Sequence, residues 1–258
     1  MLAIERKNQI LTILQEDKRV LVSDLSLRFN VSEETVRRDL EKLENEGYVV
    51  KTYGGAVIKE ENNADLPYFI RKKKNVIGKQ RIAELAAELI SDGESVMLDA
   101  SSTAVFIAKK IKNKKNLTII TSSVEIIFEL ADVGGWKIIS TGGEMKEGSL
   151  SLIGSRAENA VKNYNADKAF ISCKGLDIKS GITDTNEMNA IIKTAMFSSS
   201  ECRVLAIDSS KFNLKSFAKI ADIKEADVII TDKKPDGKWL DYFENNKIKC
   251  LYPMQSEI

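Results

Sequence analysis

Apolar residues recur at helical spacing in three short stretches at the start of the chain. A spacing of three and four residues places side chains on one face of a helix, so each stretch predicts a short amphipathic helix. The second helix is expected in the stretch LVSDLSLRFN, with Ser23 as its N-cap. The residues expected to face inward from the first two helices are Ile10, Leu11, Ile13 and Leu14, followed by Leu25, Leu27 and Phe29.

The third stretch, VSEETVRRDLEKLENEGYV, carries the clearest helix signals. Ser32 is a suitable N-cap because its hydroxyl can accept a hydrogen bond from an unpaired N–H of the first turn. Val36, Leu40 and Leu43 then follow at i, i+4 and i+7, which predicts a buried stripe. Gly47 is a suitable residue just beyond the helix end, where a left-handed backbone is common.

After this helix, YVVKTYGGAVIK predicts a tight β-hairpin around Gly54-Gly55. Three short helices followed by a hairpin are the layout of a winged helix-turn-helix, whose third helix enters the DNA major groove. Arg37 and Arg38 lie off the buried stripe, where they could contact base edges or phosphates. A charged face on a short helix is equally typical of solvated surface, so the spacing alone leaves both interpretations open.

The polar residues 59–75 predict a linker between a domain at residues 1–58 and a second domain at residues 76–258. The four basic residues from Arg71 are expected to form the solvated start of the next helix, with phosphate contact as the alternative. Beyond them, helical segments alternate with short apolar runs, which predicts an α/β domain with a mostly parallel sheet. The expected strands are SVMLDA, LTIITSS, WKIIST, KAFISC, CRVLAID, DVIITD and IKCLYP.

Hydroxyl, glycine, aspartate and lysine residues follow five of these strands. Ligands of open α/β sheets bind beyond the carboxyl ends of the strands, and hydroxyls, helix starts and lysines suit an anionic ligand. Such residues are also common in caps and loops, but their repetition at five strand ends favours a pocket. The predicted effector-binding residues are Asp99, Ala100, Ser101, Ser102, Thr103, Thr121, Ser122, Gly142, Gly143, Lys174, Gly175, Asp208 and Lys211.

Composition excludes several classes of function. The chain of 258 residues contains no histidine, which rules out Ser-His-Asp and Cys-His hydrolases of the usual form. Its three cysteines are far apart, which argues against a disulfide framework and a zinc cluster, so no metal or cofactor is predicted. The absence of a secretory signal and of a long apolar run favours a cytoplasmic protein. The net charge of +1 gives no global sign of nucleic-acid binding.

The N-terminal sixty residues resemble the DeoR family of bacterial transcriptional regulators. The resemblance is carried by E-R-x-x-x-I-L near the start, by VSEETVRRDLEKL, and by the Gly-Gly-Ala turn of the wing. Tyr53 stands where the family usually has histidine. The DNA-binding residues that this resemblance implies, together with the exposed positions above, are Ser23, Ser32, Thr35, Arg37, Arg38, Lys42, Lys51, Tyr53, Gly54 and Gly55.

The resemblance extends to the second domain, which in this family is a sensor similar to ribose-5-phosphate isomerases. The family pattern D-x-G-T-T is matched by DASST, with Ser101 in place of glycine and Ser102 in place of threonine. The next pattern, I-T-N-S, is matched with Ser122 in place of asparagine. A side chain in place of the glycine changes how closely a phosphate can approach the backbone.

The resemblance implies a regulator, expected to be a repressor of a sugar-catabolism operon that is controlled by a phosphorylated sugar. Its expected partners are double-stranded operator DNA and copies of itself in a homodimer or homotetramer. The alternative is a phosphosugar isomerase fused to a DNA-binding domain, with Glu187, Asp99 or Asp177 as the base and Lys174 or Lys211 assisting. A purely architectural DNA binder is a third hypothesis, but it leaves the polar strand ends unexplained.

Overall fold

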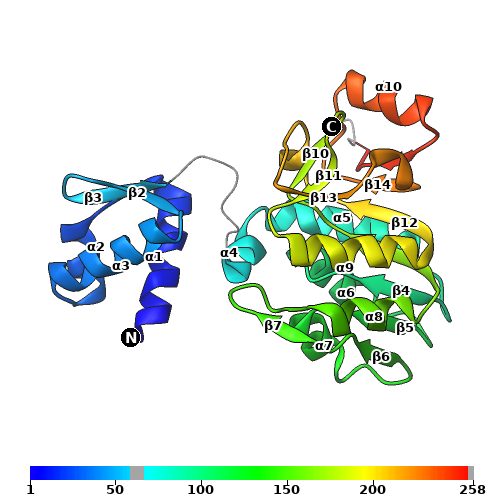
Figure 1. The fold of residues 1–258 in the computed structure, drawn as a ribbon, viewed down its shortest axis with the longest axis horizontal. Helices are drawn as coiled ribbons and strands as arrows, with labels where there is room; N and C mark the ends of the chain where they lie inside the picture. The colour runs from blue at the N-terminus through cyan, green and yellow to red at the C-terminus, as the bar shows by residue number, and fades with distance from the viewer. Residues whose placement is uncertain (59–66, 255–258) are drawn as a thin grey trace. The chain divides into compact units, whose positions relative to one another are not determined.

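The computed structural model describes residues 1–58 and 67–254, which fall into two units, Met1–Ile70 and Arg71–Ile258 (Figure 1). The N-terminal unit contains three helices and a three-stranded antiparallel sheet with the strand order β1-β3-β2. Its elements are α1 (Ala3–Asp17), β1 (Arg19–Leu21), α2 (Val22–Phe29), α3 (Glu33–Asn45), β2 (Val49–Thr52) and β3 (Gly55–Ile58).

The hydrophobic core of this unit confirms most of the predicted stripes. Ser32 caps α3 by accepting a hydrogen bond from the N–H of Thr35 at 3.3 Å, and Gly47 follows the helix with φ of +79°. The inward faces of α1 and α3 pack together in one core, where their apolar side chains are buried away from water. The buried residues include Ile10, Leu11, Ile13 and Leu14 of α1 and Val36, Leu40 and Leu43 of α3.

Two expectations about α2 are wrong. The helix begins at Val22, so Ser23 lies inside its first turn and does not cap it. The N–H of Val22 donates to the carbonyl of Gly54 at 2.8 Å, so the wing turn satisfies one N–H group of the first turn of α2. Leu27 is almost fully exposed, because the buried face of α2 runs through Val22 and Leu25.

An ion pair inside the unit fixes α1 against α3. The guanidinium of Arg6 donates to both carboxylate oxygens of Asp39, at 2.5 Å from Nε and 3.3 Å from Nη2. Both side chains are more than nine-tenths buried. Two parallel hydrogen bonds to a carboxylate define the orientation of both groups, so this pair sets the position of α3 as well as its attachment.

The last part of the predicted linker is helical. Residues 59–66 lie outside the described part of the chain, but α4 (Tyr68–Lys73) forms a short helix in which Ile70 is buried in the N-terminal core. The basic residues from Arg71 therefore end α4, whereas they were expected to begin the following helix. That helix, α5 (Val76–Glu88), begins after Asn75, whose side chain accepts a hydrogen bond from the N–H of Gly78 at 3.3 Å.

The second unit is built on a seven-stranded sheet in which every neighbouring pair is parallel, as the alternating pattern predicts. The strand order is β15-β14-β12-β9-β4-β5-β6, and all seven predicted strands are present. Their bounds are β4 (Ser95–Leu98), β5 (Thr118–Thr121), β6 (Lys137–Ser140), β9 (Ala166–Ile171), β12 (Ser200–Ala206), β14 (Val228–Ile230) and β15 (Lys249–Leu251).

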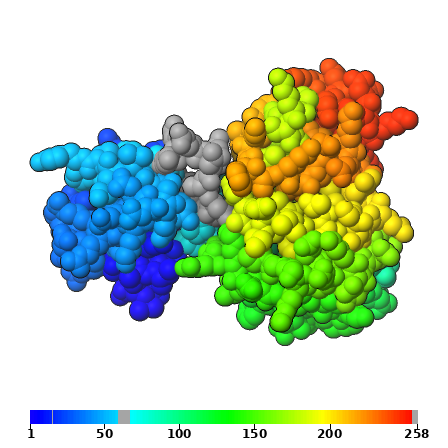
Figure 2. Space-filling view, viewed as in Figure 1, coloured from blue at the N-terminus to red at the C-terminus, as the bar shows by residue number. Residues whose placement is uncertain are grey.

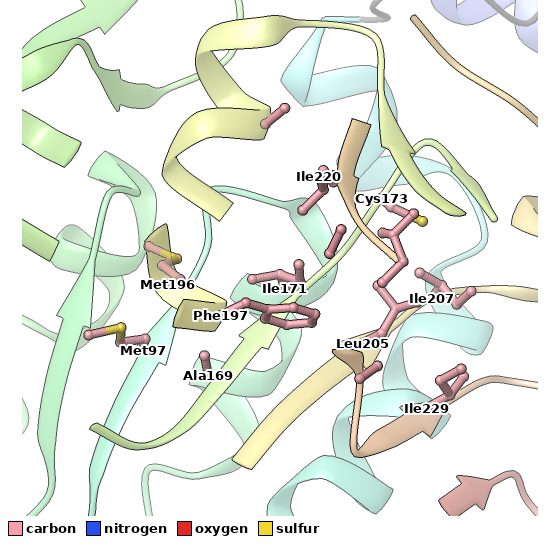
Figure 3. Close-up of a cluster of buried hydrophobic side chains, with 14 of the residues drawn as sticks. Met97, Ala169, Ile171, Cys173, Met196, Phe197, Leu205, Ile207, Ile220 and Ile229 are labelled. Carbon is pink, nitrogen blue, oxygen red and sulfur yellow. The ribbon is translucent and has the colours of Figure 1, made fainter. Parts of the chain in front are cut away.

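Helices cover the sheet in two layers (Figure 1). Met97, Ala169, Ile171 and Leu205 point from adjacent strands into one apolar cluster with Phe197 and its neighbours on α9 (Figure 3). Alternate residues of a strand face the other side of the sheet, where α5, α6 and α7 pack side by side. The remaining helices are α6 (Ser102–Lys110), α7 (Val124–Leu130), α8 (Ser155–Lys162), α9 (Glu187–Ser198) and α10 (Gly237–Asn245).

Two small antiparallel sheets, which the sequence did not predict, complete the unit. One is the hairpin β7 (Glu144–Lys146) and β8 (Ser151–Ile153), and the other has the order β10-β11-β13. Their strands are three or four residues long and include polar residues, so they give no apolar run in the sequence. The bounds of the second group are β10 (Gly175–Asp177), β11 (Gly181–Asp184) and β13 (Ala218–Ala221), and short 3-10 turns lie at Ser209–Lys211 and Ile223–Glu225.

The Arg6–Asp39 pair generates a stability prediction. Replacing Asp39 by alanine leaves a buried guanidinium without its partner, which is expected to lower the free energy of unfolding by about 3–5 kcal/mol. The control is Glu46→Ala, which breaks the neighbouring, more exposed Lys7–Glu46 pair and should cost about 0–1 kcal/mol. Urea unfolding of the two variants measures the difference, and equal losses would contradict a special role for Arg6.

Candidate functional sites

The face of α3 that points away from the core is exposed and carries both basic and acidic side chains. Arg37 and Arg38 are exposed, and each is paired with the acid one turn earlier in the same helix. The Arg37–Glu33 distance is 2.7 Å and the Arg38–Glu34 distance is 3.3 Å. Exposed pairs of this kind are worth about 0.3–0.5 kcal/mol, so the arginines can exchange them for another anion at little cost.

The other predicted DNA contacts on α3 lie on or beside the same face. Ser32 and Lys42 are exposed, and Thr35 is half-buried. The hydroxyls of Ser32 and Thr35 are 2.9 Å apart at the start of the helix, where unpaired N–H groups and the helix dipole favour an anion. Ser23 is exposed on α2, where its hydroxyl donates to Asp24 at 3.2 Å.

The wing is a narrow projection from the N-terminal unit, drawn in cyan in Figure 2. Tyr53 and Gly54 form its turn, and the side chain of Tyr53 is fully exposed at the tip. Gly54 has φ of +82°, which disfavours other residues, whereas Gly55 begins β3 and is required for a different reason. A Cβ on Gly55 would lie 2.0 Å from the carbonyl oxygen of Val20, so glycine lets β1 approach the wing. Lys51 pairs with Glu44 of α3 at 3.7 Å.

The parallel sheet brings the other predicted residues to one side of the second unit, here called the carboxyl edge, formed by the residues that follow β4, β5, β6, β9, β12 and β14. Asp99, Thr121, Lys174 and Asp208 follow adjacent or next-adjacent strands there. Gly142 and Asp208 are four strand spacings apart, about 19 Å at about 4.8 Å each. One small ligand therefore cannot contact every predicted residue.

Asp99 organises the middle of the carboxyl edge. One carboxylate oxygen accepts a hydrogen bond from the N–H of Ser101 and the other from the N–H of Ser172, both at 3.0 Å. The side chain is buried, so these bonds join the residues after β4 to those after β9. Asp99 therefore positions two loops of the carboxyl edge.

A buried lysine that the sequence analysis missed lies beside Asp99. The ammonium of Lys193, on α9, is 2.5 Å from Asp184 and 3.5 Å from Asp99, and it donates to the carbonyl of Ser172 at 2.8 Å. The two carboxylates raise its pKa above the usual lysine value although burial opposes this. One signal could have revealed it, because Lys193 lies three residues from Ala190 and three from Met196 on the buried stripe of α9.

Hydroxyl groups cap the helices that begin at this edge. Ser101 accepts a hydrogen bond from Ala104 N–H at 3.0 Å at the start of α6, so the serine that replaces the family's glycine acts as an N-cap. Ser123 caps α7 in the same way, at 3.2 Å from Ile126. Thr121 donates to the carbonyl of Leu98 at 2.6 Å and is fully buried.

The remaining predicted effector residues differ in exposure. Those that are buried are Ser102, Thr103, Ser122 and Gly175, those that are half-buried are Ala100, Lys174 and Lys211, and those that are exposed are Gly142 and Gly143.

A second buried lysine, Lys79 of α5, lies toward β12 and was also missed by the sequence analysis. Burial lowers its pKa to about 8, the nearby Asp208 partly offsets this, and the cations Lys211, Arg71 and Lys74 lower it further. The side chain is still mostly charged at neutral pH. It therefore brings a positive charge to the carboxyl edge beside two of the predicted ligands, Asp208 and Lys211.

The described residues hold no group of three or more His, Cys, Asp or Glu side chains placed to bind a metal ion. The three cysteines are free thiols, and burial raises the pKa of Cys173 to about 12, which keeps it protonated. Among the helices of the described residues, none has the length and apolarity needed to cross a membrane.

Comparison with known families accounts for both units. The family model described as a DeoR-like helix-turn-helix domain matches residues 6–62, and the DeoR C-terminal sensor domain matches residues 74–233. The chain belongs to the DeoR family of transcriptional regulators. This confirms the resemblance and the expected combination of a DNA-binding helix-turn-helix domain with an α/β sensor domain.

Relatives in this family match nearly the whole chain. The HTH-type transcriptional regulator YulB of Bacillus subtilis is 39% identical over 96% of this chain and 96% of its own length. The transcriptional repressor GlcR of the same species is 33% identical, covering 98% and 97% of the two chains. The L-fucose operon activator of Haemophilus influenzae is 31% identical, covering 95% and 98%.

These relatives are named as transcriptional regulators, so the isomerase alternative is not favoured. Ribose 5-phosphate isomerase A from Methanocaldococcus jannaschii matches the structure with a TM-score of 0.40 and 16% identity, covering 54% of this chain and 55% of that one. A likeness of this extent carries no conclusion about activity.

The Lys193 site generates a second stability prediction. Lys193→Met leaves Asp99 and Asp184 buried without their cation, which is expected to cost about 3–5 kcal/mol of unfolding free energy. The control is Lys162→Met, which breaks an exposed pair with Glu158 on α8 and should cost about 0–1 kcal/mol. Urea unfolding of the sensor unit within the full chain measures both, and a loss below 1 kcal/mol for Lys193→Met would contradict this account.

Proposed function

We propose that this regulator represses a sugar-catabolism operon by binding its operator through α3 and the wing, and that a phosphorylated sugar controls this binding. The observation that carries the DNA-binding part is the exposed pair Arg37 and Arg38, whose helix is fixed from behind by a buried ion pair. The proposed DNA contacts are Ser23, Ser32, Thr35, Arg37, Arg38, Lys42, Lys51, Tyr53, Gly54 and Gly55.

The effector part is supported by the chemistry of the carboxyl edge. Serine, threonine and glycine residues start helices there, and Lys79, Lys174 and Lys211 bring positive charge. Anions bind at such helix starts and to lysine ammonium groups. The name of one relative, an L-fucose operon activator, supports control of carbohydrate genes, and the name of another, a transcriptional repressor, supports repression.

The proposal includes self-association and action in the cytoplasm, where bacterial operators lie. Helix-turn-helix proteins commonly bind two half-sites as dimers, so a homodimer or homotetramer fits this DNA-binding unit. A footprint on a site selected by the wild-type protein should show paired or repeated protection. Protection of a single isolated half-site would count against the oligomer.

The arginines of α3 give the direct test of DNA binding. Arg37→Ala combined with Arg38→Ala should weaken binding to that selected site by about 2–6 kcal/mol, since each arginine contact to a base is worth about 1–3 kcal/mol. The fold should persist because both side chains lie outside the core. Fluorescence anisotropy at fixed salt measures the affinity.

The matched control removes two charges elsewhere. Lys109 and Lys110 are adjacent exposed cations at the end of α6, and each pairs with a glutamate as the two arginines do. Lys109→Ala combined with Lys110→Ala should leave the affinity for DNA nearly unchanged. Wild-type affinity in the double arginine variant would overturn the assignment of α3 as the reading helix.

A thermal-shift screen against phosphorylated and unphosphorylated sugars tests the effector. A ligand that binds only the folded state adds about 2.7 kcal/mol at a concentration 100-fold above its Kd. Lys211→Ala should reduce the shift and leave DNA affinity intact. A shift with free sugars alone would exclude a phosphorylated effector, and an unchanged response in the variant would exclude Lys211 as a ligand.

A further inference from the structure

Lys79 has an unusual environment for a lysine. Its side chain is almost fully buried, and its ammonium donates hydrogen bonds to the main-chain carbonyls of Arg71 and Lys74. A buried ammonium costs free energy unless its N–H groups find acceptors. Two of its three donors are thus committed to residues 71–75, here called the connector, which comprise the last three residues of α4 and the two residues before α5.

Two further contacts tie the connector to the carboxyl edge. The hydroxyl of Ser102, the first residue of α6, makes a long hydrogen bond of 3.4 Å to the same carbonyl of Arg71. The amide of Asn75 donates to Asp232, which follows β14, at 3.1 Å. The position of the connector therefore depends on residues that follow β4 and β14.

The charges that face Lys79 come from the connector and from the loop after β12. The connector supplies Arg71 and Lys74, and the loop supplies Lys211 and the carboxylate of Asp208. These cations lower the pKa of Lys79, whereas Asp208 raises it. An anion beside Lys79 would be attracted to its ammonium and could accept its third N–H.

We propose that Lys79 is a positioning residue that ties the connector to the carboxyl edge, and that an anionic group bound beside it strengthens this tie. The inference rests on the proposed function only in that the effector carries such a group. Because the chain runs from the connector through α4 into the DNA-binding unit, the state of this tie is one that both DNA and effector can bias.

The rate of trypsin cleavage reports on the connector, because trypsin can cleave after Arg71, Lys72, Lys73 and Lys74. In the full-length protein, Lys79→Met should accelerate cleavage at these positions by about tenfold relative to wild type, because two hydrogen bonds from a charged donor are lost. Mass spectrometry identifies the cleaved bonds, and cleavage after Lys162 in the same digest reports general unfolding. The control, Arg81→Met, removes an exposed cation from the same helix and should leave the rate unchanged.

Inorganic phosphate tests the anion. At tenfold above its Kd, and at constant ionic strength with chloride as the reference, phosphate should slow connector cleavage of the wild type about tenfold. It should have no such effect on Lys79→Met. Ser102→Ala, which removes one long hydrogen bond to the connector, should keep its fold while its connector is cleaved somewhat faster.

Equal rates of connector cleavage in wild type and Lys79→Met would contradict the proposal that Lys79 holds the connector at the carboxyl edge. Equal protection of both proteins by phosphate would overturn the role of Lys79 toward the anion. If phosphate protects the wild type while no sugar phosphate does so more strongly, the inference stands and the proposed effector falls.

Discussion

The ammonium of Lys193 joins three segments at the carboxyl edge of the sheet. It lies between Asp99 after β4 and Asp184 at the end of β11, and it also bonds the residue after β9. A parallel sheet sends all its strand ends to one side, so polar side chains gather there and carboxylates become buried. Such carboxylates stay charged only when a cation is buried with them. The loops of the carboxyl edge, and any ligand site made from them, therefore depend on this one charge.

Much of the fold could be predicted because it follows from apolar spacing. All seven strands of the parallel sheet are short apolar runs, and the stripe Val36, Leu40, Leu43 gives α3 directly. The errors arise where tertiary contacts replace local ones. Ser23 does not cap α2, because the helix already begins at Val22, whose N–H donates to the carbonyl of Gly54 in the wing turn. The short strands of the two small sheets pair with one another through main-chain bonds, and the spacing of side chains carries no record of that pairing.

The candidate sites also divide into residues that the sequence can name and residues that only the fold reveals. Position and residue type were enough to name candidates such as Arg37, which is exposed on α3, and Lys211, which is half-buried after β12. No role is predicted from the sequence for the side chains of Arg6, Lys79 and Lys193. Each of the three lies at helical spacing from buried apolar residues, so the signal was present. Their partners, such as Asp39 for Arg6, come from distant parts of the chain and could not be named without the fold.

The structure separates charges that hold the fold from charges that can change partners. Arg6 and Lys193 are buried and form ion pairs with buried carboxylates. Separating them from these partners would cost several kcal/mol of folding free energy, about 3–5 kcal/mol when one partner is removed. Arg37 and Arg38 are exposed and paired only within their helix, at a cost of about 0.3–0.5 kcal/mol to release. Lys79 lies between these cases, because it is buried but bonded to neutral carbonyls, with three other cations and the carboxylate of Asp208 nearby. A charge of that kind gains most from an incoming anion, which is why the response of the sensor to a ligand is expected to pass through Lys79.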